Sequence, residues 1–248
     1  MGLIKHAQSA IPNLELMTFS MNNQMTEEPQ NLVAIQHRWC QAFTNEQGRI
    51  SAWTFVPKTI VGDVLSGKLQ TCSMEFSEQD PLFQLAYAWM KDAMDEAGIK
   101  GREPGMNPWW CWIRMGADQI KPTDLQADEA SVLLELSLDP KDVLLSDFDM
   151  WHVPLNYWLN AEGAEEESFE NELKLAGLNI FEDKPLPEPF HTRVQASWRD
   201  VFCLDRVNGY TGELKDKSIQ GVFWKMSPES INGIVEPDLY TDSEAQFV

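Results

Sequence analysis

Positive charge is scarce in this sequence of 248 residues. Only 19 Lys and Arg stand against 39 Asp and Glu, which gives a formal net charge of −20 and a pI near 4.4. A protein that holds a nucleic-acid backbone needs a basic surface, so we expect no direct binding of nucleic acid. The acidic excess either keeps the chain dissolved or docks on a protein partner with a basic surface.

Paired cysteines and long apolar runs are also missing. None of the four cysteines falls in a Cys-x-x-Cys pair, so the thiols fit a reducing compartment better than a disulfide framework. The N-terminus lacks the order of a secretory signal, and no apolar run is long enough to span a bilayer. We therefore expect a cytoplasmic protein with no membrane association.

Tryptophan, in contrast, is abundant, with ten residues. Each indole buries a large apolar area and also needs a hydrogen-bond partner for its N–H group. The sequence therefore predicts either a thick aromatic core or a cleft lined by aromatic rings. For any single tryptophan the core is the more common place.

Periodicity and turn residues predict an α+β fold with a mixed, mainly antiparallel sheet and flanking helices. We expect an N-terminal extension, partly helical, over residues 1–49, a single domain over 50–235 and an acidic tail over 236–248. Alternating or apolar runs predict strands at 51–56, 109–115, 132–138, 143–145 and 219–226. Apolar spacing of three and four predicts helices at 57–67, 80–98, 151–159 and 194–202.

The stretch from 143 to 158 is dense in polar and aromatic side chains. Ser146 or Asp147 can cap a helix through its side-chain oxygen. Pro154 requires that this helix either begins near Trp151 or is broken at the proline. If residues 151–159 are helical, His152 and Asn156 lie four residues apart on one face.

Two interpretations of these polar groups stay open. In the first, Asp147 and Asp149 cap a helix and His152 is a half-buried, hydrogen-bonded histidine. In the second, the three side chains form a functional cluster. A metal site is not expected, because the Asp-x-Asp and His pattern lacks a second His or Cys ligand at a usual spacing.

The aromatic strand at 109–115 predicts a binding surface. Strand alternation places Trp110, Trp112 and Arg114 on one face. Aromatic rings beside a guanidinium suit stacking and the binding of an anion or carboxylate, although an arginine paired with a nearby acid is an equal alternative. We expect a tryptophan-lined cleft between this face and the segment 147–156.

The chain resembles an uncharacterised bacterial and phage family that is catalogued as domain of unknown function three-eight-four-one. The resemblance covers about residues 50–235 and implies a domain without implying a reaction. It rests on these blocks: Trp53-Thr-Phe-Val-Pro57, Ala86-Tyr-Ala-Trp-Met90, Pro108-Trp-Trp-Cys-Trp-Ile-Arg114, Leu144-Leu-Ser-Asp-Phe-Asp-Met-Trp-His152 with Leu155-Asn156, Ser197-Trp-Arg-Asp-Val-Phe202 and Ile219-Gln-Gly-Val-Phe-Trp224.

The order of the elements is also similar to that of ADP-ribosyltransferase-type domains, which cleave NAD. In such domains a His or Arg on the first strand holds the nucleotide, and a Glu on a late strand stabilises the cationic ribose. The positions that correspond here are Thr54 and Gln220. A neutral amide does not offset a developing positive charge as a carboxylate does, so the resemblance implies NAD as a ligand and leaves catalysis open.

Three functions follow from this resemblance and from the residues. In the first, the chain is a divergent transferase in which Arg114 binds a phosphate while a carboxylate or imidazole acts as base or cation stabiliser. In the second, it has a nucleotide-binding cleft without catalysis. In the third, it is an acidic interaction protein or inhibitor that occupies a partner's basic groove. The candidate catalytic residues are Asp147, Asp149, His152 and Gln220. The candidate ligand-binding residues are Thr54, Trp110, Trp112, Arg114 and Asn156.

Overall fold

The computed structural model describes residues 31–73, 80–117, 130–209 and 211–235. Its main sheet has six strands in the order β6-β7-β4-β1-β5-β8, and every neighbouring pair is antiparallel. The predicted α+β class with a mainly antiparallel sheet is therefore confirmed. The strands are β1 Ile50–Pro57, β4 Trp109–Arg114, β5 Ser131–Leu138, β6 Val143–Asp147, β7 Ile219–Phe223 and β8 Ile231–Val235, and β2 Cys72–Ser73 pairs with β3 Met106–Asn107 outside this sheet.

Helix α3 begins where its capping residue predicts. In α3, Asp80 accepts the N–H group of Leu82 at 2.8 Å and Pro81 occupies the first turn, the arrangement that favours a helix start. The helices are α1 Leu32–Phe43, α2 Lys58–Leu65, α3 Pro81–Glu96, α4 Phe148–Leu155, α5 Ala164–Ala176 and α6 Phe190–Ser197, with short 3-10 turns η3 Trp198–Phe202, η4 Leu214–Asp216 and η5 Pro228–Ser230.

Helix α4 starts three residues before its predicted start. Asp147 caps it by accepting the N–H groups of Asp149 at 2.9 Å and Met150 at 3.1 Å. The helix holds Pro154 in its last turn and ends at Leu155. The predicted cap at Asp147 is confirmed, and the helix ends four residues before its predicted end at 159.

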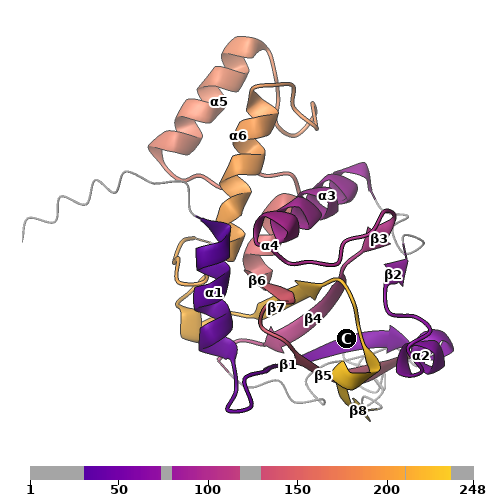
Figure 1. Cartoon of the computed structure of the whole chain (residues 1–248). Helices are drawn as coiled ribbons and strands as arrows, with labels where there is room; N and C mark the ends of the chain where they lie inside the picture. Colours follow the sequence, from indigo (N-terminus) through magenta and orange to yellow (C-terminus); the bar gives the residue numbers. More distant parts are fainter. Residues whose placement is uncertain (1–30, 74–79, 118–129, 210, 236–248) are drawn as a thin grey trace, which may run out of the picture. The chain divides into compact units, whose positions relative to one another are not determined.

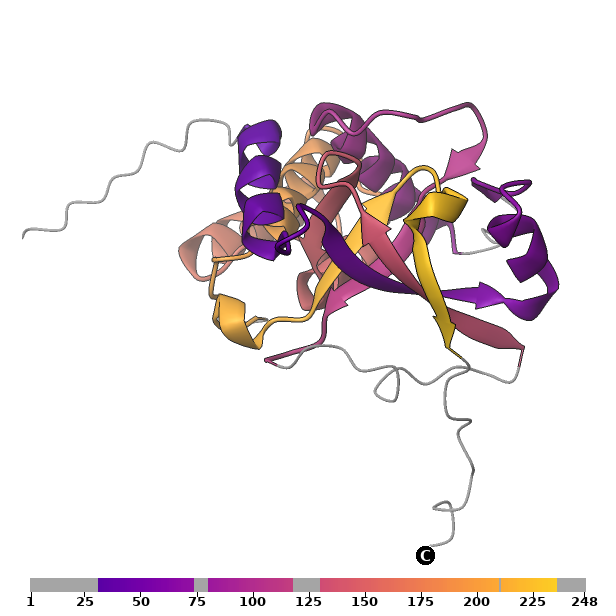
Figure 2. The same ribbon diagram turned by 60° about the horizontal axis from the view of Figure 1, so that its bottom comes forward.

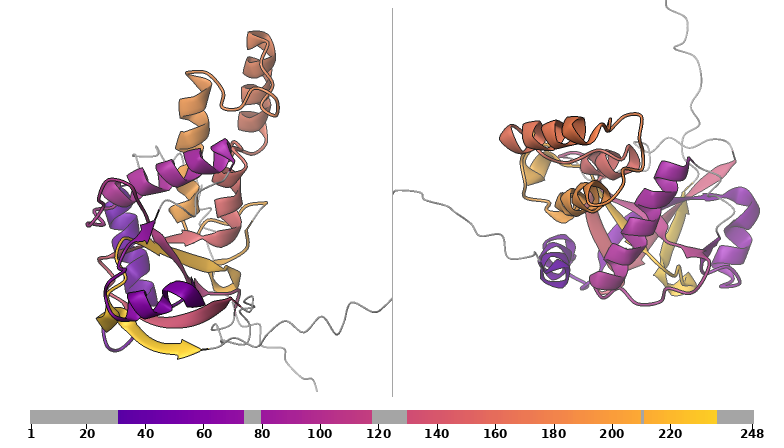
Figure 3. Two further views of the ribbon diagram at one scale, coloured as in Figure 1. Left: turned by 90° about the vertical axis from the view of Figure 1, so that its right-hand side faces the viewer. Right: turned by 90° about the horizontal axis from the view of Figure 1, so that it is seen from above.

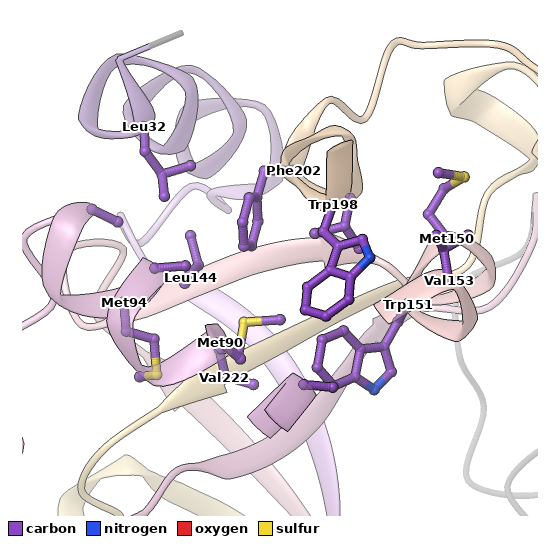
Figure 4. Close-up of a cluster of buried hydrophobic side chains, with 14 of the residues drawn as sticks. Leu32, Met90, Met94, Leu144, Met150, Trp151, Val153, Trp198, Phe202 and Val222 are labelled. Atoms are coloured by element: carbon purple, nitrogen blue, oxygen red, sulfur yellow. The ribbon is translucent and has the colours of Figure 1, made fainter. Parts of the chain in front are cut away.

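Two apolar layers pack on the two faces of the sheet. On one face, α3, α4 and η3 bury a cluster that includes Met90, Trp151 and Trp198 against β6 and β7 (Figure 4). Helices α5 and α6 lie side by side and join this layer away from the strands (Figure 3). On the other face, α1 and α2 pack against β1, β4 and β5; Figure 2 shows α1 and α2 at opposite ends of the sheet.

Helix α1 also completes the edge of the sheet at β6 (Figure 1). The buried amide of Gln36 donates to the carbonyl of Val143 and accepts the N–H group of Leu145 at 3.1 Å. An edge strand otherwise offers unpaired backbone groups, and here a side chain takes the place of a further strand. Leu32 and Trp39 of the same helix belong to different cores.

No helix among the described residues combines the length and the apolar character needed to cross a membrane.

Candidate functional site

Five side chains form a row across the main sheet. Register pairs join Glu135 to Trp53, Trp53 to Trp112, Trp112 to Gln220 and Gln220 to Ser146. Residues directly opposite each other on neighbouring strands point to the same face. A carboxylate, two indoles, an amide and a hydroxyl therefore follow one another across β5, β1, β4, β7 and β6. We call these five residues the cross-strand row.

A cavity of about 250 Å³ opens at the middle of the row, between β1 and β4. Strand β1 pairs with β5 over its whole length, whereas its register pair with β4 is Trp53 with Trp112. Beside that pair the hydroxyl of Thr54 donates to the carbonyl of Trp110 at 2.6 Å. The cavity is lined by Thr54, Phe55, Trp110, Cys111, Trp112 and Gln220.

Two polar groups at one end of the row have no hydrogen-bond partner. The hydroxyl of Ser146 is fully buried, the side chain of Gln220 is 5% exposed, and neither Ser146 Oγ nor Gln220 Nε2 bonds to any residue that the structure describes. A buried polar group without a partner costs about 1–3 kcal/mol. Such groups are uncommon in folded proteins and call for an explanation, and here the Gln220 amide faces a cavity.

Aromatic rings of α4 and α3 close the side of the row next to the helices. The ring centre of Phe148 lies 4.6 Å from that of Trp112, and Trp151 lies 5.0 Å from Trp110. Tyr87 contacts Trp110 edge-on at 5.7 Å. These tilted and edge-on contacts are the arrangements that aromatic pairs prefer, so the helix side chains hold the two indoles that line the cavity in place.

Asp147 is fully buried and is held by protein groups. Its carboxylate pairs with the buried ammonium of Lys217 at 2.8 Å and accepts the hydroxyl of Thr211 at 2.7 Å. It also caps α4, as described above. Of the two interpretations of this residue, the structure therefore shows the capping one, and the carboxylate lies outside the lining of the cavity.

Asp149, His152 and Asn156 lie along α4 beside the row. Asp149 is exposed, and burial of part of its carboxyl and the neighbouring Asp147 raise its pKa above the usual value. The exposed His152 ring stands edge-on to Phe148 at 5.1 Å. The amide of Asn156 donates to the carbonyl of His152 at 2.7 Å, so the predicted polar pair shares one side of the helix. None of the three lines the cavity.

Arg114 does not share a face with Trp110 and Trp112, and the prediction that it does is wrong. The register of β4 against β7 shifts between Trp112 and Arg114, and a bulge of this kind interrupts strand alternation. The guanidinium stacks over Phe43 at 5.3 Å and donates to the carbonyl of Lys217 at 3.1 Å and to that of Leu214. Burial lowers its pKa. Arg114 thus joins backbone segments on the opposite face.

Sequence reasoning missed Glu135 and Phe55 and considered Ser146 only as a cap. The signal for Glu135 was present, because it is the one charged residue in the apolar strand Ser131–Leu138. A charge inside an apolar strand faces either solvent or a site. Which other side chains share its face depends on the strand order, and the sequence does not give that order.

The described residues contain no group of three or more His, Cys, Asp or Glu side chains placed to hold a metal ion. The chain matches the family described as "Domain of unknown function (DUF3841)" over residues 52–232. This match covers most of the chain, so the protein belongs to that family. Comparison with curated proteins and with solved structures gave no match.

Proposed function

We propose that this member of the family binds the planar ring of a nucleotide-like ligand in the cavity between β1 and β4, with NAD as the first candidate. The observation that carries the proposal is the pair of buried polar groups without a partner, Ser146 Oγ and Gln220 Nε2. A ligand that presents an acceptor to the Gln220 amide removes a cost that the unliganded protein bears.

The shape and lining of the cavity support a ring as the bound group. Trp110, Trp112 and Phe55 offer aromatic surfaces, and stacking of a base on an aromatic side chain contributes about 1–3 kcal/mol. A volume of about 250 Å³ lies below the range of about 300–1,000 Å³ typical for drug-sized ligands. The cavity therefore suits one ring system, and the rest of a larger ligand lies outside it.

The residues support binding more directly than catalysis. Gln220 is neutral, Asp147 is buried in a structural ion pair, and Arg114 lies on the other face. His152 and Asp149 are exposed on α4 beside Phe148, where an imidazole or carboxyl can reach a ligand that extends from the cavity. A transferase reaction of the ADP-ribosyltransferase type would depend on these two residues as proton acceptors.

The same proposal places the protein in the cytoplasm. Cys40 and Cys111 are buried as free thiols, the state expected in a reducing compartment.

The test is thermal unfolding with and without excess NAD. Ligand at about 100 times its dissociation constant adds roughly 2.7 kcal/mol, which raises the unfolding temperature of a chain this long by roughly 5–10 °C. Trp112→Ala should abolish the rise. Trp158→Ala, which removes an indole that is 37% exposed and outside the cavity lining, should keep it. No rise in the wild-type protein, or an equal rise in both variants, contradicts the proposal.

A further inference from the structure

Glu135 stands at the end of the cross-strand row opposite to Gln220. It lies directly across from Trp53 on β5 and points to the same face as the two indoles. The carboxylate lies over Gly233 of β8, where an added Cβ atom would come within 3.4 Å of Glu135 Oε2. The absence of a side chain at Gly233 therefore leaves room for the carboxylate on this face.

The surroundings of Glu135 are aromatic and aliphatic. Trp53, Phe55, Trp112, Met115 and Val235 pack around the buried Leu133, and all but Leu133 are only partly buried. The cluster itself is made of strand residues and Met115, and Phe148 of α4 contacts it at Trp112 with a ring distance of 4.6 Å. The half of the sheet face at β1, β5 and β8 therefore presents indole and phenyl rings with one carboxylate beside them.

No cation within the described residues neutralises this carboxylate. Lys and Arg side chains form ion pairs with other acids, such as Lys225 with Glu103 and Arg199 with Glu96, and none of these pairs involves Glu135. A carboxylate in a partly apolar setting without a counter-charge is unfavourable. A cation that binds beside it removes this penalty.

We propose that the row selects a ligand whose ring carries a positive charge, with Trp53 and Trp112 as the aromatic surface and Glu135 as the counter-charge. This inference rests on the proposed function and names the ligand class for that site. Aromatic faces attract cations through the ring quadrupole, with a contribution of about 0.5–2 kcal/mol. The net charge of −20 also favours the approach of cations over anions.

The spacing of the strands sets the distances between the residues of the cross-strand row. Neighbouring strands lie about 5 Å apart, so Glu135 is about two strand spacings from Trp112 and about three from Gln220. A pyridinium ring stacked at Trp112 then directs a ring substituent to the Gln220 amide. Its positive nitrogen faces Trp53 and Glu135. An N-alkylated pyridinium carboxamide stacked at Trp112 offers its carboxamide to Gln220, while its positive ring lies about two strand spacings from Glu135, so the carboxylate acts on it through charge and not through contact.

The experiment compares two probes that differ in one charge, 1-methylnicotinamide and nicotinamide, by isothermal titration calorimetry. The wild-type protein should bind the cation about tenfold more tightly, which corresponds to about 1.4 kcal/mol. Glu135→Gln should remove this preference by weakening the cation alone. Glu229→Gln, an exposed carboxylate in η5 that changes the net charge equally, should retain it.

The outcomes separate the inference from the function on which it rests. If the wild-type protein binds both probes equally, or if Glu135→Gln keeps the preference, the inference is wrong while ring binding stands. If neither probe binds and NAD leaves the unfolding temperature unchanged, the proposed function fails together with the inference. Thermal unfolding of Glu135→Gln without ligand checks that this near-isosteric variant is folded.

Discussion

Two pairs of buried polar residues lie next to each other where β6 and β7 meet, and they differ in how their hydrogen bonds are satisfied. Asp147 and Lys217 bond to each other, and each has further protein partners. Ser146 precedes Asp147 in the same strand and lies opposite Gln220, yet both residues hold a polar atom without a partner. The charged pair is held by protein groups, and Gln220 of the neutral pair lines the cavity.

This difference shows that residue type alone does not identify a site. A buried charge is tolerated only when it is paired and hydrogen-bonded, so the fold surrounds Asp147 completely. A neutral amide or hydroxyl carries a smaller penalty, and a folded protein can leave it unpaired when a ligand is its partner. The predictions below test whether the two pairs differ in this way, from the largest expected effect to the smallest.

Removing Lys217 from its ion pair with Asp147 should take away a large part of the protein's free energy of unfolding. Lys217→Met leaves the Asp147 carboxylate buried without its cation, and loss of one partner from a buried ion pair costs about 3–5 kcal/mol. Urea denaturation measures this loss. The matched control is Lys225→Met, whose partner Glu103 is exposed at the surface, and it should change stability by less than about 1 kcal/mol. If the two variants lose the same stability, the buried pair of Asp147 and Lys217 is no more important for the fold than a surface ion pair.

Arg114→Ala should weaken the fold and leave ligand binding intact. The guanidinium donates to the carbonyls of Lys217 and Leu214 on the face opposite Trp112, and loss of hydrogen bonds from a charged donor costs about 1.5–3 kcal/mol. The measurement is the rise in unfolding temperature with NAD, taken relative to the variant's own baseline. A rise as small as that of Trp112→Ala would place Arg114 in the site after all.

Removal of the Thr211 hydroxyl and removal of the Ser146 hydroxyl should change the stability of the unliganded protein in opposite directions. Thr211→Val removes a donor to Asp147 and should destabilise the protein by about 1–2 kcal/mol. Ser146→Ala removes a buried hydroxyl that has no partner, and it should stabilise the unliganded protein by up to about 1 kcal/mol. Denaturant titration of the two variants in parallel measures both. If Ser146→Ala also destabilises, the hydroxyl has a structural partner.

The sequence predicted much of the fold because local signals were strong. Asp80 and Pro81 marked the start of α3, and Asp147 was one of the two caps predicted for α4. Strand β8 was missed because Ile231–Val235 contains Asn and Gly, which are depleted in strands. It forms through pairing with β5, a tertiary contact that no local pattern shows.

The candidate site was predictable only in part. Strand alternation correctly placed Trp110 and Trp112 on one face, but the bulge before Arg114 has no sequence signature that we recognised. The cross-strand row depends on the order β5-β1-β4-β7-β6, which brings Glu135 and Ser146 into line with residues far away in sequence. Sequence periodicity gives the face of each strand, and only the fold gives its neighbours.

The most direct test of the account is the unfolding free energy of Gln220→Met, compared with the wild-type protein, both without ligand and with excess NAD. Without ligand, the variant should be the more stable by about 1 kcal/mol, because it lacks the unpaired buried amide. With NAD, the order should reverse, because only the wild-type amide gains its partner. A variant that is less stable without ligand, or that gains as much from NAD as the wild-type protein, would contradict the central claim.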